Sequence, residues 1–138
     1  MPLTVSLREL TNSYVRLRDV AGTVPAPVSH LIRFYSVECG LKALALKARN
    51  GRSTAQQQEL VTHDLRQLAK NLKLSASAYQ DLVNCRRPAK GGFSHPPVTA
   101  RELHEAWRYG AELDPEDEKQ TVAGLSTLGQ LCAERIGR

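Results

Sequence analysis

The chain has 138 residues, a net charge of +5, a hydrophobic fraction of 41% and a charged fraction of 24%. This length predicts a single domain, residues 1–138, with a core of its own. No apolar run approaches the roughly 18 residues that cross a bilayer, so we expect no membrane segment, and the basic excess is compatible with nucleic acid without requiring it.

A helical period governs the first part of the chain. Residues 1–20 predict an N-terminal helix, from Leu3 to Val20, which ends at a linker rich in glycine and proline. Residues 28–49 predict a longer central helix, because apolar residues recur there at spacings of three and four. Since these residues cover more than one side, several neighbouring helices should pack against it.

Capping signals place the short helices that follow. One is expected to begin near Thr54. The segment Thr62-His63-Asp64 is typical of an N-cap, so a second helix should start directly after it. Ser75 or Ser77 should cap a third, which is expected to run through Val83.

Two stronger signals start the last helices. Thr99 and Glu102 have the spacing of a capping box, for a helix expected to reach Leu113. Asp114 followed by Pro115 predicts the start of the final helix. With no strand candidate, the chain is predicted to be all-α, an antiparallel up-and-down bundle of five or six helices.

The segment 86–97, RRPAKGGFSHPP, is predicted to be a basic loop because it holds three prolines and two glycines among its cations. Cations can hold phosphate while an aromatic ring stacks on a base. A solvated loop without a ligand would have the same composition, so both interpretations stay open. The candidate nucleic-acid-binding residues are Arg86, Arg87, Lys90 and Phe93.

Three segments, taken in order, resemble the HEPN family of small helical domains. Residues 34–44, FYSVECGLKAL, look like the family's A-x-E-K-x-L-K-A-L helix. Residues 62–65 look like its T-H-D-L helix start, and residues 107–109 fall where the family often has an aromatic residue with R-Y. The resemblance covers residues 28–136 and implies a helical bundle that forms homodimers.

The HEPN resemblance also implies a class of activity. Many members are metal-independent ribonucleases, often toxins or antiviral effectors, and some pair with a minimal nucleotidyltransferase. Their catalysis uses an arginine and a histidine separated by four to six residues. Here two residues separate Arg101 from His104, seven separate Arg87 from His95, and no histidine follows Arg108. This spacing favours a member that binds without cleaving.

If RNA is cleaved, an arginine would hold the scissile phosphate while a histidine moves a proton. Residues at steps of three, four and seven on the helix after Thr99 share one face and include both residue types. A solvated helix face has a similar composition. The candidate catalytic residues are Arg101, His104, Arg108 and, from the loop, His95.

The other polar residues have structural interpretations. Glu38 and Lys42, four residues apart, predict an ion pair within the bundle. Asp64 should cap a helix while His63 packs on the central helix, although a carboxylate beside an imidazole can also tune a base. The three cysteines have no metal-ligand spacing, which predicts reduced thiols in the cytoplasm, no metal and no cofactor.

Two functions from different classes remain. The first is a non-catalytic HEPN-like binding module, homodimeric and cytoplasmic, which contacts RNA or a nucleotide through the basic loop and a helix face. The second is a metal-independent ribonuclease with a rearranged Arg/His site. A role in antiviral defence or as half of a toxin–antitoxin pair, with a nucleotidyltransferase as partner protein, depends on the neighbouring gene.

Overall fold

The computed structural model describes residues 3–55, 57–89, 92 and 94–138, and within them the chain is all-helical. The prediction of an all-α protein is confirmed. Two isolated antiparallel bridges, Ser6 with Ser53 and Cys85 with Val98, are the β pairings found in this part of the chain. The helices are α1 (Leu7–Ala21), α2 (Val28–Ala48), α3 (Leu65–Asn71), α4 (Leu103–Tyr109) and α5 (Pro115–Ile136).

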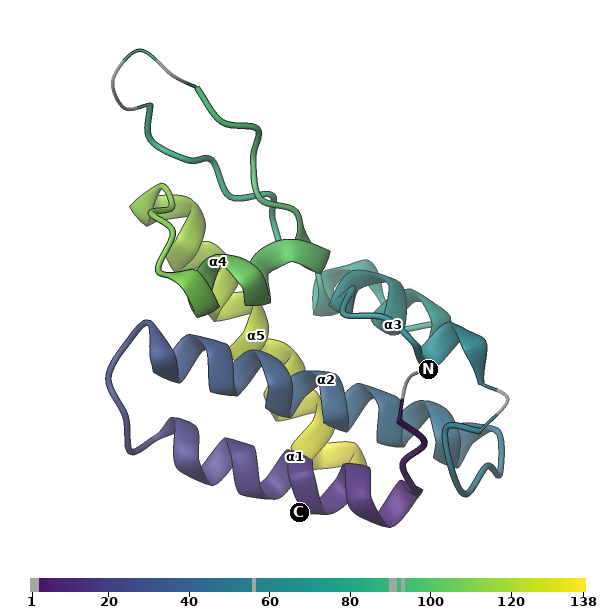
Figure 1. Cartoon of the computed structure of the whole chain (residues 1–138). Helices are drawn as coiled ribbons and strands as arrows, with labels where there is room; N and C mark the ends of the chain where they lie inside the picture. The colour runs from purple at the N-terminus through teal and green to yellow at the C-terminus, as the bar shows by residue number, and fades with distance from the viewer. Residues whose placement is uncertain (1–2, 56, 90–91, 93) are drawn as a thin grey trace.

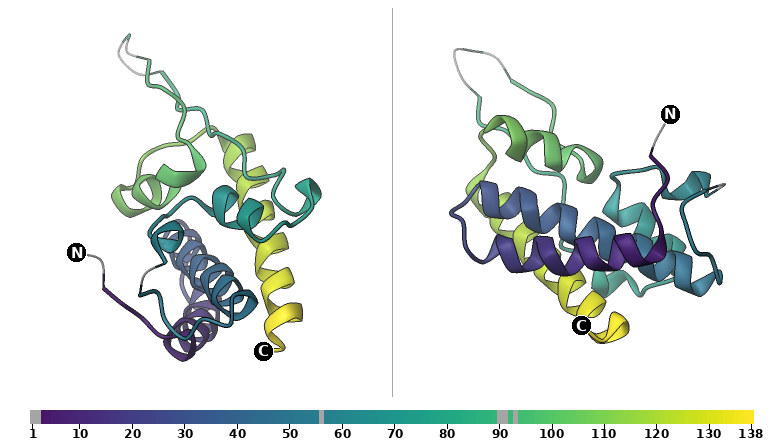
Figure 2. Two further views of the ribbon diagram at one scale, coloured as in Figure 1. Left: turned by 90° about the vertical axis from the view of Figure 1, so that its right-hand side faces the viewer. Right: turned by 60° about the horizontal axis from the view of Figure 1, so that its bottom comes forward.

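Helix α2 lies at the centre of the arrangement (Figure 1). α1 runs antiparallel along one side of it, while α4 and α3 lie on the other side, over its first and second halves. α5 passes behind α2 and crosses the α1–α2 pair, as the turned views in Figure 2 show. α2 therefore contacts all four other helices, as its many-sided apolar pattern predicted.

The core follows from that central position. Phe34, Val37 and Leu41 of α2 are each at most 1% exposed. They pack in one cluster with Leu125 and Leu128 of α5 and with residues of every other helix. The predicted bounds of the central helix are confirmed to within one residue, because the chain turns at residues 49–51 directly after Ala48.

Helix α1 starts later than predicted. The Ser6 hydroxyl accepts from the Glu9 backbone N–H at 3.0 Å, and a Glu9 carboxylate oxygen accepts from the Ser6 N–H at 2.9 Å. This capping box starts the helix at Leu7. The predicted start at Leu3 is wrong, because Val5 instead exchanges hydrogen bonds with Thr54, at 3.0 Å and 2.8 Å.

Other predicted helices are shorter in the structure. Among the described residues after Thr54 there is a 3-10 turn, η1 (Gln58–Leu60), and the region after Ser75 holds another, η2 (Ala76–Ala78). The Thr99 capping box is confirmed, but it opens the 3-10 turn η3 (Ala100–Glu102), which leads into α4. That helix stops at Tyr109, short of the predicted end, because Gly110 adopts a left-handed φ of 67° and closes it.

The Asp64 and Asp114 caps are confirmed, with side chains that accept from the N–H groups of Gln67 and Asp117. The described residues of the 86–97 segment form no helix and project away from the helices beyond α4 (Figure 1). Among the described residues, no helix combines the length and the apolar character needed to cross a bilayer.

Candidate functional site

A buried carboxylate on α2 organises the most polar part of the interior. Glu38 has a side chain only 10% exposed, and both of its oxygens are bonded. Oε2 accepts from Lys42 Nζ at 3.1 Å, which confirms the predicted ion pair. Oε1 lies 2.7 Å from Nδ1 of His63, so the residue before the α3 cap packs on the central helix as predicted. The carboxylate thus fixes the orientation of an imidazole that is about half exposed.

A second histidine lies directly against the first. The rings of His63 and His104 are 4.3 Å apart, and His104 also packs at 5.5 Å from the ring of Phe34. His104 is 5% exposed, and its Nδ1 has no hydrogen-bond partner among the described residues. Burial, followed by the nearby His63, lowers the pKa of His104 below the usual histidine value. His104 is therefore a neutral imidazole with unused hydrogen-bonding capacity.

A tyrosine and an arginine extend this group towards solvent. The ring of Tyr35 is 6.2 Å from that of His104, and its hydroxyl accepts from the Arg108 guanidinium. Arg108 is exposed, so its remaining N–H groups are accessible. The residues linked in this way come from α2, the segment before α3, and α4. We call them the α2–α4 polar cluster: Tyr35, Glu38, Lys42, His63, His104 and Arg108.

The structure brings together two of the four predicted catalytic residues. His104 and Arg108 belong to the cluster, whereas Arg101 lies exposed in η3 and His95 lies exposed on the 86–97 segment. No described contact links either of these two to the cluster. The link between Glu38 and His63 was missed at the sequence level because the two residues are 25 positions apart. The sequence predicted that His63 packs on the central helix, but it did not identify Glu38 as the partner.

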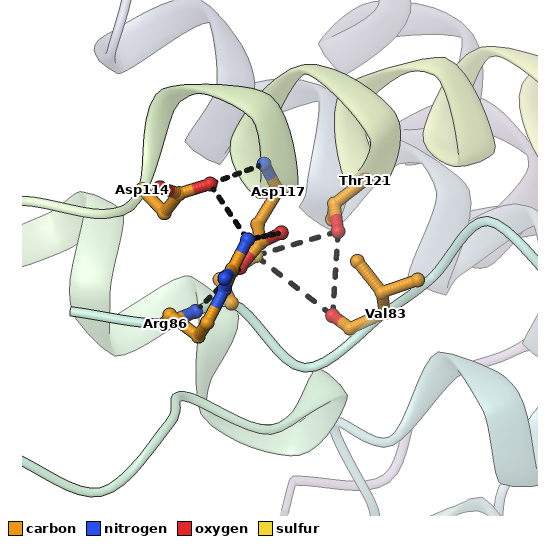
Figure 3. A network of polar contacts seen from close by, with 6 residues as sticks. Val83, Arg86, Asp114, Asp117 and Thr121 are labelled. Carbon is orange, nitrogen blue, oxygen red and sulfur yellow. Dashed lines mark hydrogen bonds and ion pairs between the residues drawn. The ribbon is translucent and has the colours of Figure 1, made fainter.

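The basic loop is attached to the start of α5 by its first arginine (Figure 3). Arg86 Nε and the Arg86 backbone N–H both donate to Asp117 Oδ2, each at 2.9 Å. Its outer nitrogen donates to Asp117 Oδ1 at 3.1 Å and to Asp114 Oδ2 at 3.4 Å. The predicted phosphate-binding role of Arg86 thus competes with an internal ion pair. Arg87 is half-buried, and Lys90 and Phe93 lie outside the described residues.

The contact between Arg86 and Asp117 predicts a titration at unusually low pH. It lowers the pKa of Asp117 to about 2, from an ordinary 3.8. Because the folded state then holds this proton less tightly than the unfolded chain, the contact stabilises the fold above about pH 4, and this contribution is lost as the pH falls towards 2. We expect Arg86→Ala to return the Asp117 pKa towards 3.8, followed by the ¹³C shift of its carboxyl group. An unchanged titration in this variant would show that the contact is absent in solution, and Arg135→Ala is the matched control.

A cavity of about 420 Å³ lies beside the cluster. Its walls come from the N-terminal segment before α1, from α1, from α2 and from residues 60–63. Its lining includes the polar side chains of Lys42 and His63, and five of its described lining residues are aliphatic. Cys39 also lines it, but burial raises the pKa of this thiol to about 11, so it is neutral and no ready nucleophile at pH 7.

Compared with models of known protein families, with curated proteins and with solved structures, the chain gives no match. In the part of the chain that the structure describes, no three His, Cys, Asp or Glu side chains are grouped so that they could hold a metal ion. The function must therefore be argued from the cluster itself.

Proposed function

We propose that this chain is a HEPN-like binding module whose ligand carries phosphate, either an RNA strand or a nucleotide, and that the ligand binds at the α2–α4 polar cluster. The observation that carries the proposal is the contact of Arg108 with Tyr35 beside the His63–His104 pair. It gathers an arginine, a half-exposed imidazole and a lysine into one connected group.

The hydrogen-bonding balance of the cluster favours an acceptor-rich ligand. Both oxygens of Glu38 are already used, whereas two N–H groups of Lys42 and Nε2 of His63 have no described partner. The Arg108 guanidinium contacts Tyr35 and Tyr109, and its exposed position leaves further N–H groups accessible. Phosphate oxygens accept readily from such donors, and arginine supplies the charge-assisted bonds. A phosphate-bearing ligand would satisfy donors that the fold leaves unused.

The HEPN resemblance adds the setting to this proposal. In it the module is a homodimer that acts in antiviral defence or in a toxin–antitoxin pair, with a nucleotidyltransferase as partner protein. The α2–α4 polar cluster then supplies the ligand contacts, and α4 provides the helix face that was expected to contact RNA or a nucleotide. Light scattering on the purified chain measures the dimer directly.

Arg108→Ala is expected to weaken binding of a short fluorescein-labelled single-stranded RNA about tenfold, measured by fluorescence anisotropy. The loss of one phosphate contact should also reduce the slope of log affinity against log salt by about 0.7. Arg135→Ala removes the same charge from the exposed end of α5 and should change affinity less than about twofold. Equal effects of the two variants, or an affinity insensitive to salt, would exclude the proposed site.

The second candidate function, a metal-independent ribonuclease, is favoured by the way Glu38 holds His63. An imidazole held at Nδ1 by a carboxylate can accept, through Nε2, the proton of a ribose 2′-hydroxyl. The 2′-oxygen would then attack the adjacent phosphorus as the bond from phosphorus to the 5′-oxygen breaks, and the departing 5′-oxygen would take up a proton from water. Arg108 would stabilise the negative charge on the phosphate.

The same purified protein separates the two functions when it is incubated with labelled RNA in EDTA. Binding without cleavage supports the module. Cleavage that is lost in His63→Ala but kept in His95→Ala supports the nuclease and assigns the base to the cluster. Cleavage lost in His95→Ala instead would place the chemistry in the basic loop.

A further inference from the structure

We propose that the 420 Å³ cavity is a binding site for a small organic acid, with its single anionic head at Lys42 and His63 and its aliphatic body along the cavity wall. This is a ligand of a different class from RNA, and the inference does not depend on the function proposed above. Lys42 and His63 also belong to the α2–α4 polar cluster, so the organic acid and a phosphate-bearing ligand would compete for the same two side chains. It rests on the shape of the cavity, on its hydrogen-bonding groups and on its charge.

The size and the walls of the cavity suit a small amphipathic molecule. Its volume falls in the range of sites that enclose small ligands, which are mostly apolar with a few convergent polar groups. The body of the ligand would lie against Val5, Leu10, Leu60 and Val61. These are aliphatic side chains, and the one aromatic ring in the lining is the imidazole of His63. An alkyl body fits such a wall without leaving polar atoms unpaired.

The N-terminal wall of the cavity is fastened in place. The Val5 N–H donates to Thr54 Oγ1 at 3.0 Å, and the Thr54 N–H donates to the Val5 carbonyl at 2.8 Å. Two residues further on, the Leu7 N–H donates to the Arg52 carbonyl at 2.7 Å. These hydrogen bonds attach the segment before α1 to the turn after α2. The N-terminal wall of the cavity is therefore held in a defined position.

The polar groups in the wall leave donors in excess. The acceptors are largely used: Glu38 by Lys42 and His63, Thr54 Oγ1 by Val5, and Thr62 Oγ1 by the Asp64 N–H at 3.0 Å. Lys42 retains two N–H groups with no described partner. Nε2 of His63 also has none, and whether it donates or accepts depends on the tautomer of the ring. An oxyanion offers the acceptors that this end of the cavity lacks.

Charge decides how many negative charges the ligand carries. Lys42 is the one lysine or arginine among the described residues that line the cavity, so the wall offers a cationic partner for a single negative charge on the ligand. Glu9 also borders the cavity, so a second negative charge would be repelled. A carboxylate is therefore favoured over a phosphate monoester, which is close to a dianion at neutral pH.

Octanoate is the probe for this site, with octan-1-ol and octyl phosphate as ligands that share its alkyl chain. We expect calorimetry to give a dissociation constant for octanoate at least about tenfold lower than for either comparison ligand. Binding of octan-1-ol as tight as that of octanoate would overturn the assignment of an anionic head. Tighter binding of octyl phosphate would overturn the preference for a monoanion.

Two variants locate the site. Val61→Trp should fill the cavity from its half-exposed rim and weaken octanoate binding about tenfold or more, while Val20→Trp, a similarly exposed valine at the end of α1, should leave it unchanged. Bound octanoate should also slow alkylation of Cys39, the one cysteine of the three that is not fully buried. If Val61→Trp binds octanoate like the original chain, or if no binding occurs at millimolar octanoate, the proposal is wrong.

Discussion

Glu38→Ala is expected to lower the free energy of unfolding by about 3 kcal/mol. The Glu38 and Lys42 side chains are 10% and 14% exposed, so the substitution leaves an ammonium group in a poorly hydrated place without its partner. His63 loses the acceptor at its Nδ1 at the same time. Removing one partner of a buried pair costs more than the pair contributes, because the remaining charge stays desolvated. Urea unfolding followed by circular dichroism at 222 nm measures the change.

Glu105→Ala is the matched control for this prediction. The Glu105 side chain is 59% exposed, and its described contact is a 4.0 Å approach to His104, so we expect a change within about 0.5 kcal/mol. Lys42→Met combined with Glu38→Ala should recover part of the loss, since the double variant buries no unpaired charge. Equal stability of Glu38→Ala and Glu105→Ala would mean that Glu38 is hydrated in solution, and the cluster would lose its organising residue.

Local signals in the sequence predicted the parts of the fold that local physics controls. The apolar period of residues 28–49 was enough to place α2. Because α2 is buried on several sides, few polar residues interrupt the apolar pattern. The Asp64 and Asp114 caps were also predictable, since a cap is a bond between residues three positions apart. The Glu38–Lys42 ion pair was predictable for the same reason, because its two residues are only four positions apart.

The missed elements are those in which long-range contacts compete with helix propensity. Leu3 has the spacing of the α1 apolar face, yet the helix starts only at Leu7, because Thr54, 49 positions from Val5, takes the backbone hydrogen bonds of Val5. The predicted helices after Thr54 and after Ser75 are replaced, within the described residues, by the 3-10 turns η1 and η2. The reason is related, since short helices depend on packing rather than on propensity. Sequence patterns alone do not show where long-range hydrogen bonds or packing override helix propensity.

The candidate site shows the same limit. His104 and Arg108 were selected because they share a helix, but their environment was not predictable, because it comes from α2 and from the segment before α3. Arg86 was assigned to phosphate on composition, and the structure pairs it with Asp117, 31 positions away. Burying His104 lowers stability, because its Nδ1 has no hydrogen-bond partner among the residues that the structure describes. Such exceptions to good packing tend to mark functional residues.

Gly40→Ala is expected to destabilise the chain by about 2 kcal/mol, although alanine is the better helix former by about 1 kcal/mol. Gly40 of α2 lies against side chains of both α1 and α5. A Cβ at this position would be 2.8 Å from Cys132 Sγ and 3.0 Å from Tyr14 Cδ1, and both side chains are fully buried. The steric cost therefore exceeds the gain in propensity, and thermal unfolding measures the difference.

Gly129→Ala on α5 is the matched control, because the nearest atom to its added Cβ would be Val37 Cγ2 at an ordinary 3.8 Å. The propensity gain should dominate there and stabilise the chain by up to about 1 kcal/mol. Cys132→Ala removes the sulfur that Gly40→Ala would strike, so the double variant should lose about 1 kcal/mol less than the sum of the two single variants. Additive losses, or a stabilised Gly40→Ala, would show that α5 does not cross α2 at this glycine, and the packing that positions the α2–α4 polar cluster would need a different arrangement.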